Sequence, residues 1–367
     1  MRAKPSLVIR TSLLHRDFMS QEDSLSVAII ADDLTSAADG AAPFVVNGLS
    51  ACVGRRKVPD GTFDVCAVDI GTRSDNPQAA ASKTERFADK LKSANYILKT
   101  VDSTLRGHVR EEISAAFRAS GRRRLVFAPA FPSAGRTTIG GVQHIRGVPV
   151  HLTEYARDPV HPASVSRLSD LLDVETADKT VLDAKTQAEL NDQVSQIEQP
   201  DEVMWVGSPG LAQALAERIK RVFEAQTLPR SNKPCLVAVG SANKLSHRQA
   251  AVLPSGFTTV ITAPAQRTGT PDQVLATLAD DAARHLATGC FGALIATGGD
   301  TMEAILDRTD IHEFALYGEI EPGFPLGSAC IANQKILLGM KAGGFGDDET
   351  LLRAVHRLNI KSKELAS

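Results

Sequence analysis

The sequence of 367 residues lacks several features that mark whole classes of protein. Its cysteines are few, odd in number and scattered, which excludes both a disulfide framework and the usual spacing of zinc ligands. They are Cys52, Cys66, Cys235, Cys290 and Cys330. No apolar run approaches the roughly 18 residues that a membrane span needs. The formal net charge of -2 leaves no basic excess to neutralise phosphates, which argues against a nucleic-acid surface.

The overall amino-acid composition is typical of a soluble globular protein. The hydrophobic content is 43% and the charged content 23%. Most of the cysteines lie within apolar runs, which predicts buried thiols in a reducing compartment, and we expect a cytoplasmic protein. Residues 1–25 are predicted to form a disordered N-terminal extension with basic residues, with Met19 as an alternative start and a transit peptide as the other interpretation.

Short apolar runs alternate with helical stretches through the first part of the chain. Ser26–Ala31, Val65–Ile70 and Tyr96–Leu98 are predicted strands, and the stretch from about Pro77 to Lys92 is a predicted helix. Such alternation implies a parallel sheet with crossover helices. A chain of this length exceeds the usual size of one core, so we expect two α/β domains, each a mostly parallel sheet flanked by helices.

Polar residues follow three of these strands. Asp32 and Asp33 come directly after the first, and a pair of carboxylates at a buried strand end is costly unless something compensates it. Helix capping explains one of the two. Arg73 follows the second strand, and Lys99–Gly107 follows the third with three hydroxyls, a carboxylate and two cations. A helix cap is the alternative for Lys99–Gly107, but this density of polar groups predicts a ligand site.

The stretch Pro129–Thr138 is too rich in proline and glycine to predict regular structure. It carries Arg136 and three hydroxyls after a strand, so we predict a clamp for an anionic ligand, with a rigid surface turn as the alternative. A hairpin is predicted beyond it, from Val142–Ile145 and Val148–Leu152.

A polar stretch with two prolines, 226–234, is the best candidate for a linker. We therefore predict one domain at 26–225 and a second at 235–367. Three strands of the second domain end in small residues, which lets a ligand approach the backbone and favours an anion at helix N–H groups. These ends are Gly240–Asn243, Gly298–Thr301 and Lys341–Gly346. They match neither the Walker pattern nor the dinucleotide fingerprint, and they predict one phosphate-rich ligand.

Six segments in this order resemble the four-carbon acid sugar kinase family, whose members phosphorylate threonate, erythronate or 3-oxo-tetronate with ATP. The segments are Ala31–Thr35, Lys99–Gly107, Pro129–Thr138, Gly298–Thr301, Pro322–Gly327 and Lys341–Gly346. The resemblance spans nearly the whole chain. It implies an N-terminal acid-sugar domain, a C-terminal nucleotide domain and an active site in the cleft between them.

The resemblance and the chemistry of the side chains together predict roles for individual residues. The predicted acid-sugar contacts are Asp32, Asp33, Arg73, Lys99, Asp102, Ser103, Thr104, Arg106 and Arg136. The predicted ATP contacts are Ser241, Gly298, Gly299, Asp300, Thr301, Gly343 and Gly344. Arginine suits a carboxylate because its planar fork binds both oxygens, and the sequence does not rank Arg73, Arg106 and Arg136 for that role. We predict Asp102 as the general base, with Asp300 as its rival or as a ligand of Mg²⁺.

The expected activity is an ATP-dependent kinase that acts on the terminal hydroxyl of a four-carbon sugar acid. The expected partners are the sugar acid and ATP with Mg²⁺, and neither nucleic acid nor a membrane is expected. Whether the chain forms a homo-oligomer is left open. The chain departs from the family pattern at Ser36, Gly240–Asn243 and Gly344, and it is somewhat short between the domains. The alternative is therefore a non-catalytic two-domain sensor that kept the fold. A nicotinamide-dependent dehydrogenase is disfavoured because the dinucleotide fingerprint is missing.

Overall fold

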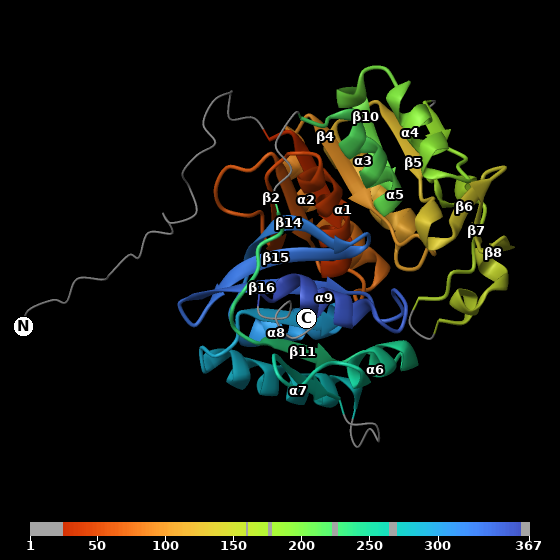
Figure 1. The fold of residues 1–367 in the computed structure, drawn as a ribbon. Coiled ribbons are helices and arrows are strands. Elements are labelled where there is room, and N and C mark those ends of the chain that lie inside the picture. Colours follow the sequence, from red (N-terminus) through yellow and green to blue (C-terminus); the bar gives the residue numbers. More distant parts are fainter. Residues whose placement is uncertain (1–24, 159–160, 175–177, 222–226, 264–269, 361–367) are drawn as a thin grey trace, which may run out of the picture.

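The described residues of the first half supply seven parallel strands to the main sheet. They are β1 (Val27–Ala31), β2 (Ala51–Arg55), β3 (Val65–Asp69), β4 (Tyr96–Thr100), β5 (Arg124–Ala128), β9 (Lys179–Val181) and β10 (Val203–Gly207). The helices that follow them in the chain are α1 (Leu34–Val46), α2 (Pro77–Leu91), α3 (Val109–Ser120), α4 (Gln187–Ser195) and α5 (Pro209–Arg218). Most of these strands are buried along nearly their whole length because helices cover both faces of a parallel sheet (Figure 1).

Within the part of the second half that the structure describes, there are six strands and four helices. The strands are β11 (Cys235–Val239), β12 (Thr258–Thr262), β13 (Ala293–Thr297), β14 (Glu313–Glu321), β15 (Phe324–Ile331) and β16 (Gln334–Lys341). The helices are α6 (Lys244–Ala251), α7 (Pro271–Ala287), α8 (Gly299–Arg308) and α9 (Thr350–Leu358). β12, β11, β13 and β16 are parallel, whereas β16, β15 and β14 form an antiparallel meander.

This computed structural model describes residues 25–158, 161–174, 178–221, 227–263 and 270–360. The two sets of strands join in one 13-stranded sheet, of order β12-β11-β13-β16-β15-β14-β2-β3-β1-β4-β10-β5-β9. The predicted α/β class with mostly parallel strands is confirmed. The N-terminal extension expected at 1–25 lies, apart from Leu25, outside the described residues.

The two halves meet where β14 pairs antiparallel with β2, through three residue pairs around Phe314 and Val53. Arg55, at the end of β2, is buried beside this seam. Its guanidinium donates to the carbonyl of Ile311 at 2.7 Å and to a carboxylate oxygen of Asp307 at 2.6 Å. Because Asp307 lies near the end of α8, this arginine connects the first half to a helix of the second.

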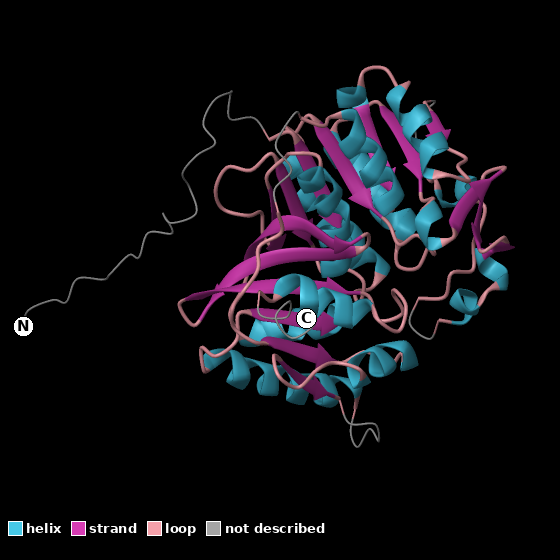
Figure 2. Ribbon diagram, viewed as in Figure 1, coloured by secondary structure: helices cyan, strands magenta, loops and turns pink. Residues whose placement is uncertain are grey.

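The hydrophobic core continues across the seam on one face of the sheet. One cluster contains residues of α1, α4 and α5 together with residues of α7 and α8. On the opposite face, α2 and α3 cover the first half and α6 and α9 the second, in two separate clusters. Figure 2 shows the helices, in cyan, layered against the strands, in magenta. Helices therefore cover both faces of the sheet.

A small antiparallel sheet packs beside the first half, formed by β6 (Arg136–Ile139), β7 (Val142–Ile145) and β8 (Val148–Pro149). The prediction that 129–138 lacks regular structure is wrong in part, since a 3-10 turn at Pro132–Ala134 leads into β6. β6 exists because β7 pairs with it residue by residue, a contact that composition does not reveal. The predicted hairpin forms, but its second strand is only two residues long.

Two further differences concern the junction of the halves. β14 and β15 were not predicted as strands, and only Pro322–Gly327, where β15 begins, was named as a segment of the family resemblance. The predicted linker 226–234 is described from residue 227 onward, and Ser231 there is tied to the end of α9. Its N–H donates to the carbonyl of Leu358 at 2.7 Å, and its carbonyl accepts from Ile360 at 2.9 Å. Within the described segments, no helix combines the length and the apolar character that crossing a membrane requires.

Candidate active site

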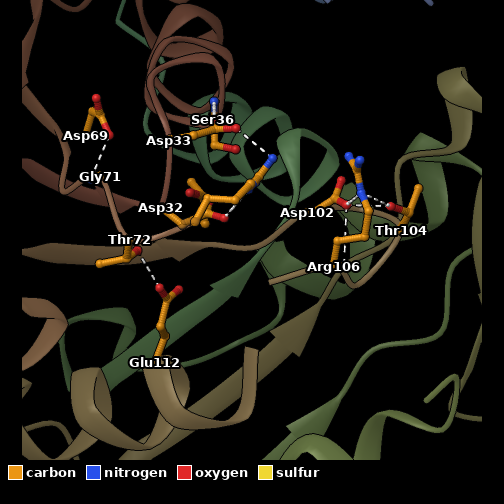
Figure 3. Close-up of polar contacts among 12 residues, drawn as sticks. Asp32, Asp33, Ser36, Asp69, Gly71, Thr72, Asp102, Thr104, Arg106 and Glu112 are labelled. Atoms are coloured by element: carbon orange, nitrogen blue, oxygen red, sulfur yellow. Dashed lines mark hydrogen bonds and ion pairs between the residues drawn. The ribbon is translucent and has the colours of Figure 1, made fainter. Parts of the chain in front are cut away.

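Three polar segments follow three adjacent strands, β3, β1 and β4, at their carboxyl ends. Asp32 and Asp33 follow β1, Arg73 lies just beyond β3, and Asp102 lies just beyond β4. α1 packs on one face of the sheet and α2 on the other, so the winding of the chain reverses at β1. Open α/β sheets bind ligands at such a switch point. The structure thus brings these predicted residues together, as Figure 3 shows for the aspartates.

Arg73 lies between the two aspartates that follow β1. Its Nε donates to Oδ2 of Asp32 at 2.8 Å, and its Nη2 lies 2.6 Å from the same oxygen. Its Nη1 lies 2.6 Å from Oδ2 of Asp33. Asp33 also caps α1, because its Oδ1 accepts from the N–H of Ser36 at 2.7 Å. One guanidinium therefore compensates both carboxylates, and capping adds a second role for Asp33.

The two carboxylates differ in their electrostatics. Burial raises the pKa of Asp32, but the positive charges of Arg73 and Lys99 outweigh burial and hold this pKa below the ordinary value. Burial also raises the pKa of Asp33, where Arg73 offsets it only in part and the neighbouring Asp32 adds to it, so the pKa stays raised. Asp33 is the better proton acceptor of the pair, because its proton affinity is the higher.

Asp102, the predicted general base, is held by its own loop. Its Oδ2 accepts from Nε of Arg106 at 2.6 Å and from the hydroxyl of Thr104. Burial alone would raise the pKa of Asp102, but Arg106 and Arg73 lower it to about 2. A carboxylate so strongly stabilised in its charged form takes up a proton poorly at neutral pH. The role of Asp102 as general base stays a prediction, and these contacts make that role less favourable.

Arg106 is held from the outside by a segment that the sequence analysis did not single out. The Tyr155 ring lies under the guanidinium, with 5.5 Å between its centroid and the guanidinium carbon. A carboxylate oxygen of Asp158 lies 3.5 Å from Nη1. Both residues lie in or next to the 3-10 helix Glu154–Arg157, far from the other site residues in sequence. Only the fold brings them to the Asp102–Arg106 loop.

Lys99 lies beneath the site rather than in it. Its side chain is fully buried, and its Nζ lies 2.8 Å from Oε2 of Glu112 on α3 and 2.7 Å from the carbonyl of Thr100. The other oxygen of Glu112 accepts from the hydroxyl of Thr72 at 2.5 Å. This buried network ties β4 to α3 and to the loop that carries Arg73. In this structure Lys99 therefore supports the site from below, and a direct contact to the acid sugar stays a prediction.

Ser103 and Arg136 lie toward the small sheet. The carbonyl of Ser103 accepts from Nε2 of the buried Gln143 at 2.8 Å, and the same nitrogen donates to the carbonyl of Pro129 at 3.1 Å. Gln143 thereby links β7 to the loops after β4 and β5. Arg136 donates through Nη1 to the carbonyl of Ala134 at 2.8 Å, while its buried Nε has no hydrogen-bond partner among the described residues.

The glycine-rich strand ends of the second half also converge. The N–H of Ser241, after β11, donates to the carbonyl of Thr297 at 3.1 Å, and the N–H of Gly298 donates to the carbonyl of Lys341 at 2.8 Å. A Cβ on Gly343 would lie 2.1 Å from Oγ of Ser241, so this approach requires glycine. Gly298 has a φ of +97° and caps α8. We name this arrangement the glycine cradle: Ser241, Gly298 and Gly343 with their loops.

The remaining predicted ATP contacts lie around the glycine cradle. Thr301 is buried, and its Oγ1 would lie 2.1 Å from a Cβ on Gly240. Gly344 faces the amide of Asn243, which would lie 3.1 Å from a Cβ there. Asp300 is exposed in the first turn of α8. Among the described residues no group of three or more His, Cys, Asp or Glu side chains is arranged to hold a metal ion.

The two halves of the site touch at the N-termini of two helices. Gly299, at the start of α8, packs so closely on Thr35, at the start of α1, that a Cβ there would lie 2.5 Å from Oγ1 of Thr35. We name Asp32, Asp33 and Asp102 the aspartate cluster. Asp33 caps α1 and Gly298 caps α8, so the aspartate cluster and the glycine cradle face each other across this contact. Thr35 ends the segment Ala31–Thr35, but nothing in that pattern predicts that it joins the two halves.

Lys341 is a further buried cation, at the end of β16. Its Nζ donates to the carbonyls of Ala342 at 2.9 Å and Gly343 at 3.2 Å. Burial lowers the pKa of Lys341 to about 8. Its charge therefore lies directly beneath the glycine cradle, where it is available to attract an anion.

Asp69, at the end of β3, allows the effect of burial on a carboxylate pKa to be tested. It is fully buried, and its Oδ1 accepts from the N–H of Gly71 at 2.9 Å. Burial, with Glu303 and Asp33 nearby, raises the pKa of Asp69 to about 8 from an ordinary value of 3.8. The folded protein thus favours the protonated acid. Its contribution to stability is present below about pH 4 and is lost as the pH rises to about 8.

We expect Asp69→Asn to remove this pH dependence, because the amide keeps the acceptor for Gly71 without a titrating group. The free energy of unfolding of the wild type, relative to this variant, should fall by about 1.4 kcal/mol per pH unit between pH 5 and 7. Urea unfolding at several pH values measures it. Asp192→Asn on the exposed face of α4 is the control. Parallel curves for wild type and Asp69→Asn would contradict the prediction.

Comparison with known proteins places this geometry in a family. The sugar-binding N-terminal domain model matches residues 27–181, and the nucleotide-binding C-terminal domain model matches residues 258–351. A D-threonate kinase of Cupriavidus necator is 31% identical, in an alignment that covers 90% of this chain and 97% of the relative. The chain belongs to the four-carbon acid sugar kinase family. It is therefore a phosphotransferase that acts on a sugar acid.

Other members of the four-carbon acid sugar kinase family match over similar lengths. A D-threonate kinase of Salmonella typhimurium is 25% identical over 90% of this chain and 98% of the relative. A 3-oxo-tetronate kinase of Burkholderia multivorans is 25% identical over 90% and 96%. The Cupriavidus alignment spans 418 positions, more than the 367 residues of this chain, so that relative has segments that this chain lacks.

Solved structures support the fold. A Salmonella typhimurium protein described as a tRNA synthase superposes with a TM-score of 0.76 at 20% identity, covering 91% of this chain and all of that one. A Haemophilus influenzae protein superposes with a TM-score of 0.68 at 18% identity, covering 89% and 98%. These similarities extend across both halves, so the shared architecture includes the arrangement of the two halves.

Proposed function

We propose that this family member transfers a phosphoryl group from ATP to the terminal hydroxyl of a four-carbon sugar acid: threonate, erythronate or an oxo-tetronate. The observation that carries the proposal is the contact of Thr35 with Gly299, which makes the aspartate cluster face the glycine cradle. Phosphoryl transfer needs alignment and charge compensation more than covalent chemistry by the protein. An acceptor site that faces a phosphate site across one helix contact supplies that alignment.

On the acceptor side, Arg136 is the best candidate for the carboxylate of the sugar acid. Arg73 is already paired with Asp32 and Asp33, and Arg106 with Asp102. Arg136 has no carboxylate partner among the described residues, and its Nε is buried without a hydrogen bond. A planar guanidinium in that state suits a substrate carboxylate. The carboxylates and the hydroxyl of Thr104 are then available to the sugar hydroxyls.

On the donor side, the glycine cradle suits the phosphates of ATP. Gly298 and Gly343 leave the backbone open, and the first N–H groups of α8 favour an anion. Lys341 adds a positive charge beneath them. Asp300 is exposed at the start of α8, where it would hold Mg²⁺ together with phosphate oxygens. Mg²⁺ in kinases is usually bound by one or two carboxylates plus phosphates, so the lack of a larger protein ligand set among the described residues fits this role.

We assign the acid-sugar role to 26–225 and the nucleotide role to 235–367. The two family models lie inside these bounds, at 27–181 and 258–351. The boundary at 226–234 itself stays a prediction.

A coupled assay for ADP release tests the proposal. The panel consists of the stereoisomers of threonate and erythronate with their 2-oxo and 3-oxo forms, each with ATP and Mg²⁺. We expect turnover with at least one of them and none when the sugar acid is omitted. Nucleotide binding in calorimetry without ADP release on any member of the panel would contradict the proposal and favour a two-domain sensor.

A further inference from the structure

The reaction requires a carboxylate that accepts the proton of the acceptor hydroxyl. The candidates Asp32, Asp33 and Asp102 differ in their exposure and in their position in the site. The base must be open to the substrate and must lie where acceptor and phosphate meet. The side chain of Asp32 is only 5% exposed and that of Asp102 is 13% exposed, whereas that of Asp33 is 23% exposed. Accessibility therefore favours Asp33 among the three.

Position favours Asp33 as well. It is the N-cap of α1, two residues before the Thr35 that touches Gly299, so it lies on the side of the aspartate cluster that faces the glycine cradle. Asp102 lies after β4, in a loop tied to Arg106, and Arg106 in turn contacts Asp158 on the outer side. Asp300 belongs to α8 on the donor side. Only Asp33 combines a place on the acceptor side with closeness to the helix contact.

We propose that Asp33 is the general base of the transfer and that Asp102, through its ion pair with Arg106, positions the sugar acid. This assignment rests on the proposed kinase function. In the transfer the hydroxyl proton passes to the Asp33 carboxylate while the acceptor oxygen forms a bond to the γ-phosphorus. The bond from that phosphorus to the bridging oxygen breaks, and ADP leaves with its electron pair.

Several charged groups face Asp33 and set its proton affinity. Arg73 lies 2.6 Å away and favours the carboxylate, whereas Asp32, Asp69 and Asp39 are negative or titrating neighbours. Burial outweighs the arginine, which keeps the pKa of Asp33 above its ordinary value. Protonation of Asp33 in acid therefore removes the base, and kcat should decline toward low pH with an apparent pKa above the ordinary range for aspartate.

The test compares Asp33→Asn with Asp102→Asn in the full chain. Asparagine at 33 keeps the cap of α1, because its side-chain oxygen also accepts from the N–H of Ser36. We expect Asp33→Asn to lower kcat by about 10² to 10⁴ while the KM for the sugar acid changes little. The decline of kcat toward low pH should disappear in this variant. Asp102→Asn should raise the KM for the sugar acid about tenfold or more and keep kcat within a few-fold of the wild type.

Asp33→Ser provides a second variant, since serine caps a helix equally well and has no carboxylate. It should show the same loss of kcat, with ADP binding in calorimetry unchanged. A wild-type kcat in Asp33→Asn and Asp33→Ser, or a loss of kcat confined to Asp102→Asn, would overturn the assignment and leave the kinase function standing. A wild type that turns over no member of the tetronate panel would overturn both.

Discussion

Glu112→Gln should destabilise the protein by about 3–5 kcal/mol. The variant removes the carboxylate that faces the fully buried Lys99 and leaves its ammonium with the carbonyl of Thr100 and a neutral amide. Attraction between two buried charges compensates a large desolvation penalty, so breaking the pair leaves the remaining ion uncompensated. The hydroxyl of Thr72 also loses a charged acceptor, which loosens the loop that carries Arg73.

Urea unfolding measures this loss of stability. Two further variants test whether the loss comes from the broken ion pair. Glu111→Gln lies beside Glu112 in the first turn of α3, so it should cost only the 0.3–1 kcal/mol typical of an acidic residue at a helix N-terminus. The double variant Lys99→Met with Glu112→Leu should be nearly neutral, because apolar residues of similar volume often replace a buried ion pair without loss. A loss below about 1 kcal/mol in Glu112→Gln would contradict the prediction.

Gly343→Ala should raise the KM for the nucleotide at least tenfold. The new Cβ would lie 2.1 Å from Oγ and 2.9 Å from Cβ of Ser241, so one of the two loops must move. A shift of this kind separates the strand ends that form the glycine cradle, while the aspartate cluster on the other side of the helix contact keeps its geometry. The KM for the sugar acid should therefore change far less than the KM for the nucleotide.

Steady-state kinetics with each substrate varied in turn measures the difference. Gly256→Ala is the matched control, because this glycine lies in the same half of the chain and a Cβ there would have no atom within 4 Å. Equal rises of both KM values in Gly343→Ala would show a general loss of structure and contradict a specific role in nucleotide binding.

The sequence predicts this fold to the extent that local patterns specify it. Apolar runs such as Val27–Ala31 are buried on both faces of a parallel sheet and are readable from the residues alone. β14 was missed although its residues alternate between partly and fully buried positions, the period of two that marks a half-covered strand. β6 was missed because it depends on pairing with β7, and its proline-rich approach is typical of a loop.

The candidate site was predictable as a set of strand ends but not as a network of partners. Nothing local indicates that Lys99 faces Glu112, that Arg73 joins Asp32 to Asp33, or that Thr35 packs on Gly299. These pairings join residues up to hundreds of positions apart, and only the path of the chain decides them. The residues alone therefore indicate the chemistry available at the site but not which carboxylate is best placed to react.

The seam between β2 and β14 limits how such an enzyme can be divided or rearranged during evolution. Each of these strands hydrogen-bonds to a neighbour in its own half on one side and to the other half on the opposite side. Cutting the gene between the halves would leave each fragment with an unpaired strand edge, which invites aggregation. Separate production of the two halves would therefore expose strand edges that the intact chain keeps paired, unlike the separation of modules that a linker merely tethers.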